Sequence, residues 1–226
     1  MKKLSTIFLV LALCLPVIIN TSNAQEEESS SPFSLGTDIV SNYVWRGTKL
    51  GSGPNIQPYV EFGIAGLTVG SWGSFAFNTS SVVENDFYLS YGFNFGLSLG
   101  VTDYYYQGPL FDFSDSTGSH AIEINGSYEI GGLSLSANYI VNEAGGAASA
   151  GSDMYFEAMY SFENFDIFIG AGDGWHTTTG NFEVVNVGIS TSKEIKIIDK
   201  FSLPVFGSVI VNPQAEIAYV VVGISF

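Results

Sequence analysis

The stretch Ala218-Tyr219-Val220-Val221-Val222-Gly223-Ile224-Ser225-Phe226 decides the fold class of this chain. Every second side chain in it is apolar, as in a β-strand that presents one apolar face. An aromatic residue at the end of such a strand is typical of outer-membrane barrels, whose apolar side chains point outward between two aromatic girdles. The stretch therefore predicts the closing strand of a membrane-spanning β-barrel.

Residues 1–24 have the pattern of a secretion signal. Two lysines precede an apolar stretch, and the small-residue site Ser22-Asn23-Ala24 follows it. Pro16 interrupts the apolar stretch, whereas a membrane-spanning helix needs about 20 apolar residues in succession. We expect a cleaved signal peptide at 1–24, an acidic, serine-rich segment at 25–32 and one barrel domain at 33–226.

Alternation of apolar and polar residues recurs along the whole domain. The runs cover residues 33–46, 56–64, 67–77, 86–93, 97–105, 122–130, 133–141, 154–162, 165–169, 185–189, 203–211 and 218–226. They predict an all-β fold, a transmembrane antiparallel up-and-down β-barrel of about 12 strands, an even number as in single-chain bacterial barrels. In the first run, Tyr43 and Trp45 fall on the apolar outer face and Arg46 on the inner face.

The connections between the runs alternate in length. Short ones carry Gly or Asn, which adopt the backbone conformations that tight hairpin turns require, at 65–66, 95–96, 131–132 and 163–164. Longer ones fall at 46–55, 78–84, 107–119, 143–152 and 173–181. Short periplasmic turns and longer outer loops are the barrel pattern. The segment 193–201 is too long for an inner turn, so we expect an extended periplasmic hairpin there.

A soluble β-sandwich would show the same alternation with its faces exchanged. Three features favour the inside-out arrangement, and the first is that the chain is predicted to be exported. Aromatic residues on the apolar face gather near the strand ends, as interfacial girdles require, and the polar face has almost no lysine. Beyond the leader the chain has 5 basic against 22 acidic residues, a net charge of −17, which argues against a nucleic-acid partner. The expected location is the outer membrane of a Gram-negative bacterium.

A family resemblance begins at the first run. The stretch Tyr43-Val44-Trp45-Arg46-Gly47, together with Gly70-Ser71-Trp72-Gly73-Ser74, resembles the TorF-type family of porins. The likeness covers about a fifth of the chain, and beyond it the similarity is architectural. It implies a small barrel with a role in transport, and it brings no established substrate.

Acidic and amide side chains dominate the inward face predicted by the alternation. The candidate pore-lining residues are Asp38, Asn42, Arg46, Gln57, Glu61, Trp72, Asp86, Glu123, Asn138 and Glu157. Arg46 is the main positive charge among them, and its place beside Asp38 predicts a carboxylate partner on a neighbouring strand, Glu61 or Glu84. A barrel of about 12 strands is roughly 24 Å across the backbone, so side chains leave at most a narrow passage.

Enzymatic function has little support in the sequence. An acyl-hydrolase barrel needs a paired serine and histidine near the outer rim, and neither His120 nor His176 stands in a recognisable nucleophile pattern. We therefore expect no catalytic residues, no metal site and no cofactor. An ion in the loop Gln107–Ser119 remains an alternative, because oxygen ligands recur at calcium-loop spacing, although Thr117 stands where that motif needs glycine.

The sequence thus predicts a porin-like channel in contact with outer-membrane lipid, through which small solutes diffuse, with a preference for cations because the inward face is acidic. The alternative is a non-conducting structural or adhesion barrel that binds a partner through its outer loops. The pattern fixes neither the solute, nor whether the lumen is open, nor the oligomeric state.

Overall fold

The computed structural model describes residues 31–51, 53–77, 83–199 and 201–226. The expected signal peptide and most of the acidic segment after it lie outside these residues. The strands are β1 (Phe33–Val40), β2 (Tyr43–Trp45), β3 (Thr48–Gly51), β4 (Asn55–Ile64), β5 (Leu67–Ala76), β6 (Glu84–Gly92), β7 (Leu97–Tyr106), β8 (His120–Ile130), β9 (Leu133–Ile140), β10 (Met154–Ser161), β11 (Asp166–Gly172), β12 (Glu183–Ile198), β13 (Phe201–Asn212) and β14 (Ile217–Ser225), and two single-turn 3₁₀ helices, η2 (Gly145–Ala147) and η3 (Gly174–His176), lie in the connections.

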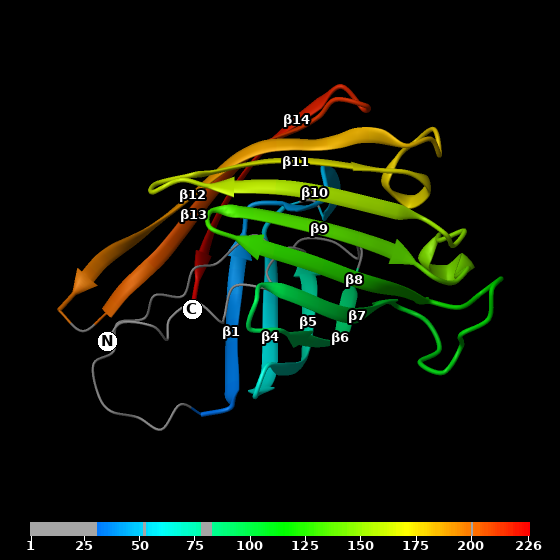
Figure 1. Ribbon diagram of the computed structural model, residues 1–226, viewed down its shortest axis with the longest axis horizontal. Helices are drawn as coiled ribbons and strands as arrows, with labels where there is room; N and C mark the ends of the chain where they lie inside the picture. The colour runs from blue at the N-terminus through cyan, green and yellow to red at the C-terminus, as the bar shows by residue number, and fades with distance from the viewer. Residues whose placement is uncertain (1–30, 52, 78–82, 200) are drawn as a thin grey trace.

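Twelve of these strands close into one antiparallel barrel. Strand β1 pairs with β14 on one side and with β4 on the other, and every remaining wall strand pairs with its neighbours along the chain (Figure 1). The expected up-and-down barrel and its strand number are confirmed. Strands β2 and β3 form a separate two-stranded sheet outside this ring of hydrogen bonds.

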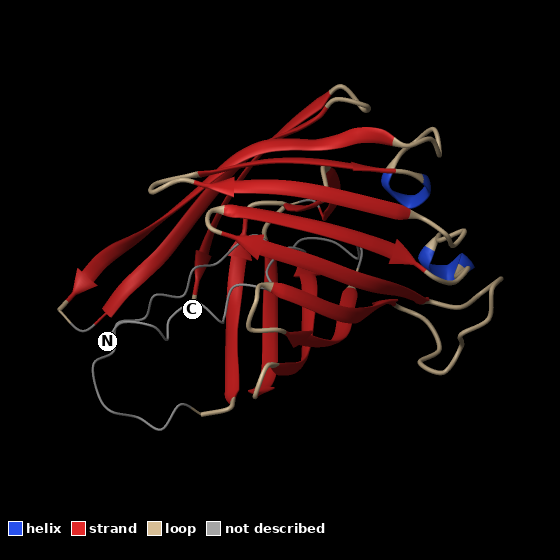
Figure 2. Cartoon of the chain, in the orientation of Figure 1, coloured by secondary structure: helices blue, strands red, loops and turns tan. Residues whose placement is uncertain are grey.

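The two rims of the barrel differ as the sequence predicts. Tight turns join β4 to β5 and β8 to β9, and Ala65, Gly66 and Gly131 in them have positive φ. Long connections, including both 3₁₀ helices, gather at the opposite rim (Figure 2). Here the rim that carries the long connections is called the outer rim and the other the inner rim. The extended hairpin expected at 193–201 is present, because β12 and β13 both run on well past their neighbours.

The faces of the wall are those of an inside-out protein. On β6 the side chains of Phe87, Leu89 and Tyr91 are exposed on the outside, whereas Asp86 and Ser90, on the opposite face of the strand, are buried. A soluble β-sandwich would bury the apolar set, so this arrangement contradicts that alternative. In the described residues no helix is long and apolar enough to cross a membrane.

The first expected strand is wrong in its second half. Strand β1 ends at Val40, the backbone bends at Ser41 and Asn42, and the chain then leaves the wall. Tyr43 and Trp45, expected on the outer apolar face, are buried instead among inward-facing residues. The alternation persists through this bend, because the hairpin β2–β3 also needs one face against a core.

Candidate functional site: a hairpin folded into the lumen

The hairpin β2–β3 turns back at Arg46 and Gly47. Both residues have positive φ, 48° and 78°, as a tight two-residue turn requires. A Cβ atom on Gly47 would lie 1.9 Å from the carbonyl oxygen of Val185 on β12. Asn212 on β13 donates a hydrogen bond to the Gly47 carbonyl at 3.1 Å. The turn is therefore pressed against the far wall of the barrel, where only glycine fits.

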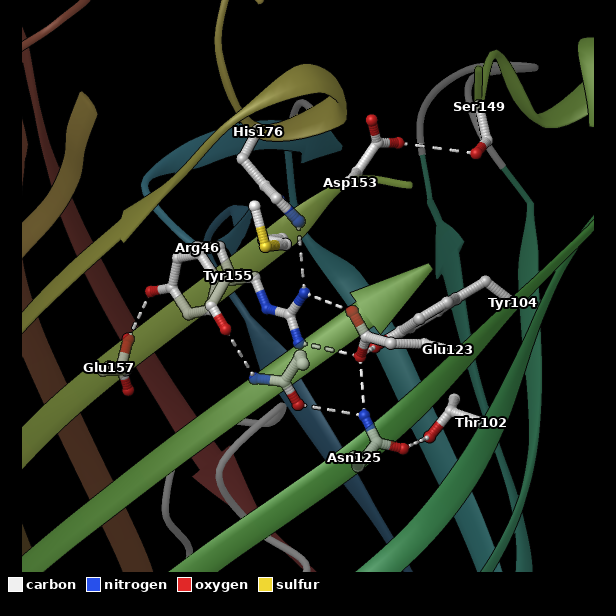
Figure 3. A network of polar contacts seen from close by, with 12 residues as sticks. Arg46, Thr102, Tyr104, Glu123, Asn125, Ser149, Asp153, Tyr155, Glu157 and His176 are labelled. Atoms are coloured by element: carbon white, nitrogen blue, oxygen red, sulfur yellow. Dashed lines mark hydrogen bonds and ion pairs between the residues drawn. The ribbon is translucent and has the colours of Figure 1, made fainter. Parts of the chain in front are cut away.

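Arg46, at the tip of the hairpin, forms a buried ion pair with Glu123 on β8. Its two terminal nitrogens donate to the two carboxylate oxygens at 2.6 and 2.9 Å, and the two side chains are 3% and 0% exposed (Figure 3). Tyr104 and Asn125 also donate to Glu123, at 2.9 and 2.6 Å. The carboxylate thus accepts from the neighbouring strand β7, from its own strand β8 and from the hairpin.

Aromatic rings enclose the guanidinium group of Arg46. Its central carbon lies 4.5 Å from the ring centroid of Trp45 and 4.4 Å from that of Tyr155. Both distances are within the range of cation–π attraction, which partly replaces the hydration that the buried charge has lost. A buried ion pair is costly to break from one side, because the remaining charge is left without compensation. The hairpin is therefore fixed at its tip by electrostatics as well as by packing.

A second inward-folded connection covers the ion pair from the outer rim. His176, at the end of η3, lies with its Nε2 atom 3.5 Å from a terminal nitrogen of Arg46. Since that nitrogen only donates, Nε2 faces it as an acceptor, which is the arrangement of a neutral imidazole. Burial, and after it the positive charge of Arg46, hold the pKa of His176 well below its ordinary value of 6.5.

The aromatic residues at this level form a continuous layer. Trp45 packs against Tyr104 and Trp175 with ring centroids 5.5 and 5.4 Å apart, and Tyr43 packs against Trp72 at 5.4 Å. Ala144 and Ala147, from the connection that contains η2, complete the buried cluster. The hairpin and two connections thus fill the lumen near the outer rim with a packed plug, defined here as β2–β3, η2 and η3.

Below the plug the inward side chains are polar and largely bonded to one another. Gln57 donates to Ser74 at 3.2 Å, and Glu61 accepts from Tyr88 at 2.8 Å. Other hydrogen bonds also join inward side chains: Asn138 accepts from Asn125, and Glu157 accepts from Tyr155 and Asn186. Asp38 and Asp86 are buried inward-facing carboxylates.

Eight of the ten candidate pore-lining residues lie on the inward face of wall strands, and two do not. That they line an open passage stays a prediction. Asp38, Gln57, Glu61, Trp72, Asp86, Glu123, Asn138 and Glu157 all belong to wall strands and alternate with the exposed apolar set. Asn42 lies in the bend after β1, and Arg46 lies on the hairpin rather than on the wall. The expected partner of Arg46, Glu61 or Glu84, is wrong. Leaving the wall carries the guanidinium across the lumen to β8.

Sequence reasoning missed Trp175 and His176 as parts of this site. Their segment has the composition of an outer loop, and no periodicity signals that it folds inward. In the loop Gln107–Ser119, the alternative ion site of the sequence, Asp112 accepts from the backbone and hydroxyl of Ser114 and from Thr117. The described residues contain no group of three side chains of the kinds that ligate metal ions.

No family model matches this chain, and neither does any curated protein. The site must therefore be interpreted from its own geometry. That geometry combines a closed wall, an acidic interior and an internal plug held at one point by an ion pair.

Proposed function

We propose that the protein is an outer-membrane channel for passive diffusion of small solutes, with a preference for cations, and that the plug sets how far its lumen opens. The observation that supports this proposal is the barrel wall itself, with apolar side chains outside and carboxylates inside. The apolar outer face of such a wall is removed from water only in lipid. The closed barrel also satisfies its backbone hydrogen bonds, because it leaves no unpaired edge in a bilayer. The proposed location is the outer membrane of a Gram-negative bacterium, and the proposed role is not enzymatic.

The charge of the interior supports the cation preference. Glu61, Glu84, Asp86 and Glu157 face inward, and the one inward arginine is already paired with Glu123. Rings of Asp and Glu favour cations in pores, because attraction between charges is stronger in a confined, partly desolvated passage than in bulk water. The resemblance to TorF-type porins agrees with a transport role.

A non-conducting structural or adhesion barrel is the second candidate, and the plug is the observation in its favour. Packed aromatic side chains occupy the outer part of the lumen. The two candidates differ in one property, because only the channel conducts ions once the plug moves. Single-channel recording in a planar bilayer is the direct test.

We expect brief, low-conductance openings from the refolded protein, and larger, steadier ones when residues 44–50 are replaced by Gly-Ser. Tyr43 and Gly51 face each other across the hairpin, so this short linker can join them without stretching the wall. In a salt gradient both proteins are expected to favour cations. A variant that is folded and inserted yet conducts nothing would support the structural barrel, and anion selectivity would contradict the cation preference.

The proposed orientation can be tested in intact cells. Phe111, in the loop at the outer rim, is 88% exposed, and Glu163 lies in a tight turn at the inner rim. A cysteine at Phe111 should react with a membrane-impermeant maleimide, and one at Glu163 should react only after the cells are opened. The mature chain has no other cysteine under the proposed cleavage, since Cys14 belongs to the leader. The opposite labelling pattern would reverse the orientation.

A further inference from the structure

A cavity of about 390 Å³ lies at the outer rim, immediately above the plug. Trp45 and Leu50 line it from the hairpin, Tyr106 and Gln107 from the end of β7, Ala147 from η2 and Trp175 from η3. Its walls thus come from all three parts of the plug and from the barrel wall. Cavities of roughly 300 to 1,000 Å³ with apolar walls and a few polar groups are typical of small-molecule sites.

Three aromatic rings line the cavity, and two pairs of them meet at steep angles. The ring of Trp175 lies 5.4 Å from that of Trp45 and 5.9 Å from that of Tyr106, with interplanar angles of 69° and 87°. Trp175 and Tyr106 are only partly buried, so they retain surface that a ligand can cover. Rings at such angles offer both a face and an edge to a planar guest, the two arrangements that aromatic pairs prefer. Gln107 adds a polar group that can orient the guest.

The surroundings of the cavity are acidic. The described outer connections carry four acidic residues, Asp112, Asp115, Glu143 and Asp173. By comparison, the hairpin contributes one exposed positive charge, Lys49 on β3. Arg46 contributes little positive field, because it is already paired with Glu123 beneath the aromatic layer. An acidic rim with low-dielectric walls concentrates cations and repels anions. Aromatic faces have the same preference, since their quadrupole attracts a cation.

We propose that this cavity is a binding site for small solutes that carry a planar aromatic ring and are neutral or positively charged, with protonated alkylamines that carry such a ring, here called aromatic amines, as the preferred class. The inference rests on the proposed channel function and adds a solute class to it. A bound amine would lie against Trp175 and Tyr106 and in contact with Trp45, which is adjacent to the arginine that fixes the hairpin. The site is thus placed where occupancy and the position of the plug affect one another.

Titration calorimetry on the folded protein in detergent tests the site without any need for conductance. The probes are phenethylamine, its neutral analogue 2-phenylethanol, its anionic analogue 3-phenylpropionate and the non-aromatic 2-cyclohexylethylamine. We expect phenethylamine to bind most tightly and 2-phenylethanol next, with the anion and the non-aromatic amine each about tenfold weaker than phenethylamine. Equal binding of all four probes, or binding of glucose in preference to them, would overturn the proposal.

Two variants localise the binding. Trp175→Ala should weaken phenethylamine binding about tenfold, and Trp175→Phe should retain most of the affinity because a ring remains. Phe111→Ala is the matched control, since it removes an exposed ring of the same rim that does not line the cavity. Unchanged affinity in Trp175→Ala would overturn the site. A protein that conducts potassium chloride but binds no aromatic amine would refute this site alone, whereas one that binds the amine but never conducts would refute the channel and leave the site standing.

Discussion

Two connections of the outer rim are held by ion pairs on opposite sides of the barrel wall. Inside, Arg46 on the hairpin pairs with Glu123. Outside, His120 at the start of β8 pairs with Asp103 on β7 at 2.9 Å. Its other ring nitrogen lies 2.9 Å from the carbonyl oxygen of Leu110, in the loop 107–119 that joins β7 to β8. Both pairs are screened from water by aromatic rings, although they face different environments.

The comparison shows how each pair is suited to its side of the wall. The rings of Tyr105 and Phe113 stack on the two sides of His120 at 4.6 and 4.2 Å, so the outer pair fixes the loop 107–119 against the apolar face. Both ring nitrogens face acceptors, so all contacts are complete only when the imidazole carries two protons. The guanidinium group of Arg46 stays protonated in a folded protein. The inner pair therefore joins two full charges, whereas the outer one joins a histidine ring to an acceptor at each ring nitrogen.

The largest effect is expected from breaking the inner pair on one side. Glu123→Gln removes the carboxylate that is hydrogen-bonded to the buried guanidinium of Arg46, and the loss of this paired charge should lower the free energy of unfolding by about 3–5 kcal/mol. The double variant Arg46→Leu with Glu123→Leu should lose less than either single change, because no unpaired charge remains. Urea denaturation in detergent measures both. The conductance of Glu123→Gln should also rise, since the tip of the hairpin is released.

The matched control is the exposed ion pair between Lys196 and Asp199 at the inner rim. Its two side chains are 66% and 95% exposed, so Lys196→Gln should change the stability by less than about 1 kcal/mol. If Glu123→Gln were no more damaging than Lys196→Gln, the plug would not depend on its ion pair. The packing of Tyr43, Trp45 and Trp72 would then have to hold the hairpin alone.

The outer pair should give an intermediate effect that stays outside the lumen. His120→Gln removes the ring that Tyr105 and Phe113 enclose and weakens the bond to Asp103, at a cost of about 1–3 kcal/mol for a charged hydrogen bond. Chymotrypsin should then cut the loop 107–119 at Phe111 or Phe113 at least about tenfold faster, because local opening exposes it. Conductance should be unchanged. A change in conductance without faster cleavage would mean that the loop is not what this pair holds.

The features that the sequence could predict are those that follow from a local pattern. Period-2 alternation is local and is read along one strand, so the barrel, its strand number and the direction of most side chains follow from it. The same alternation continues through Tyr43 and Trp45, since a hairpin inside the lumen also buries one face. Only Ser41-Asn42 and Arg46-Gly47 signal turns there, and turn residues alone do not say whether a strand leaves the wall.

The polar partners of Arg46 in the plug could not be predicted from the sequence, for a different reason. Arg46 and Glu123 are 77 residues apart in the chain, and the carboxylate that Arg46 meets depends on where the hairpin points. Each of the inward carboxylates had the right chemistry to pair with it. His176 contacts Arg46 across 130 residues, from a loop without periodicity. Long-range polar partners of this kind are fixed by tertiary packing rather than by local pattern.

Among the changes at the outer rim, the smallest effect is expected from acid, and it should act on His176 beside the inner ion pair. The pKa of His176 lies well below 6.5 because the ring is buried and Arg46 is beside it. The unfolded chain therefore binds the proton first as the pH falls, so the stabilising contribution of the neutral ring is full above about pH 6.5 and is lost progressively below it. Between pH 7 and pH 5.5 the free energy of unfolding should fall by about 1 kcal/mol through this residue.

A difference between two proteins isolates that contribution. Tyr155 also packs against the His176 ring, and Asp153 lies close to η3; burial raises the pKa of Asp153, so its protonation acts in the opposite direction. His176→Phe keeps a ring and removes the titration, so the pH dependence of the wild type minus that of the variant belongs to His176. The plug should loosen as the ring gains its proton next to Arg46, which conductance at pH 5.5 reports as longer openings in the wild type only. Parallel pH curves for the two proteins would show that His176 does not couple protons to the hairpin, and the inner ion pair would then be indifferent to acid.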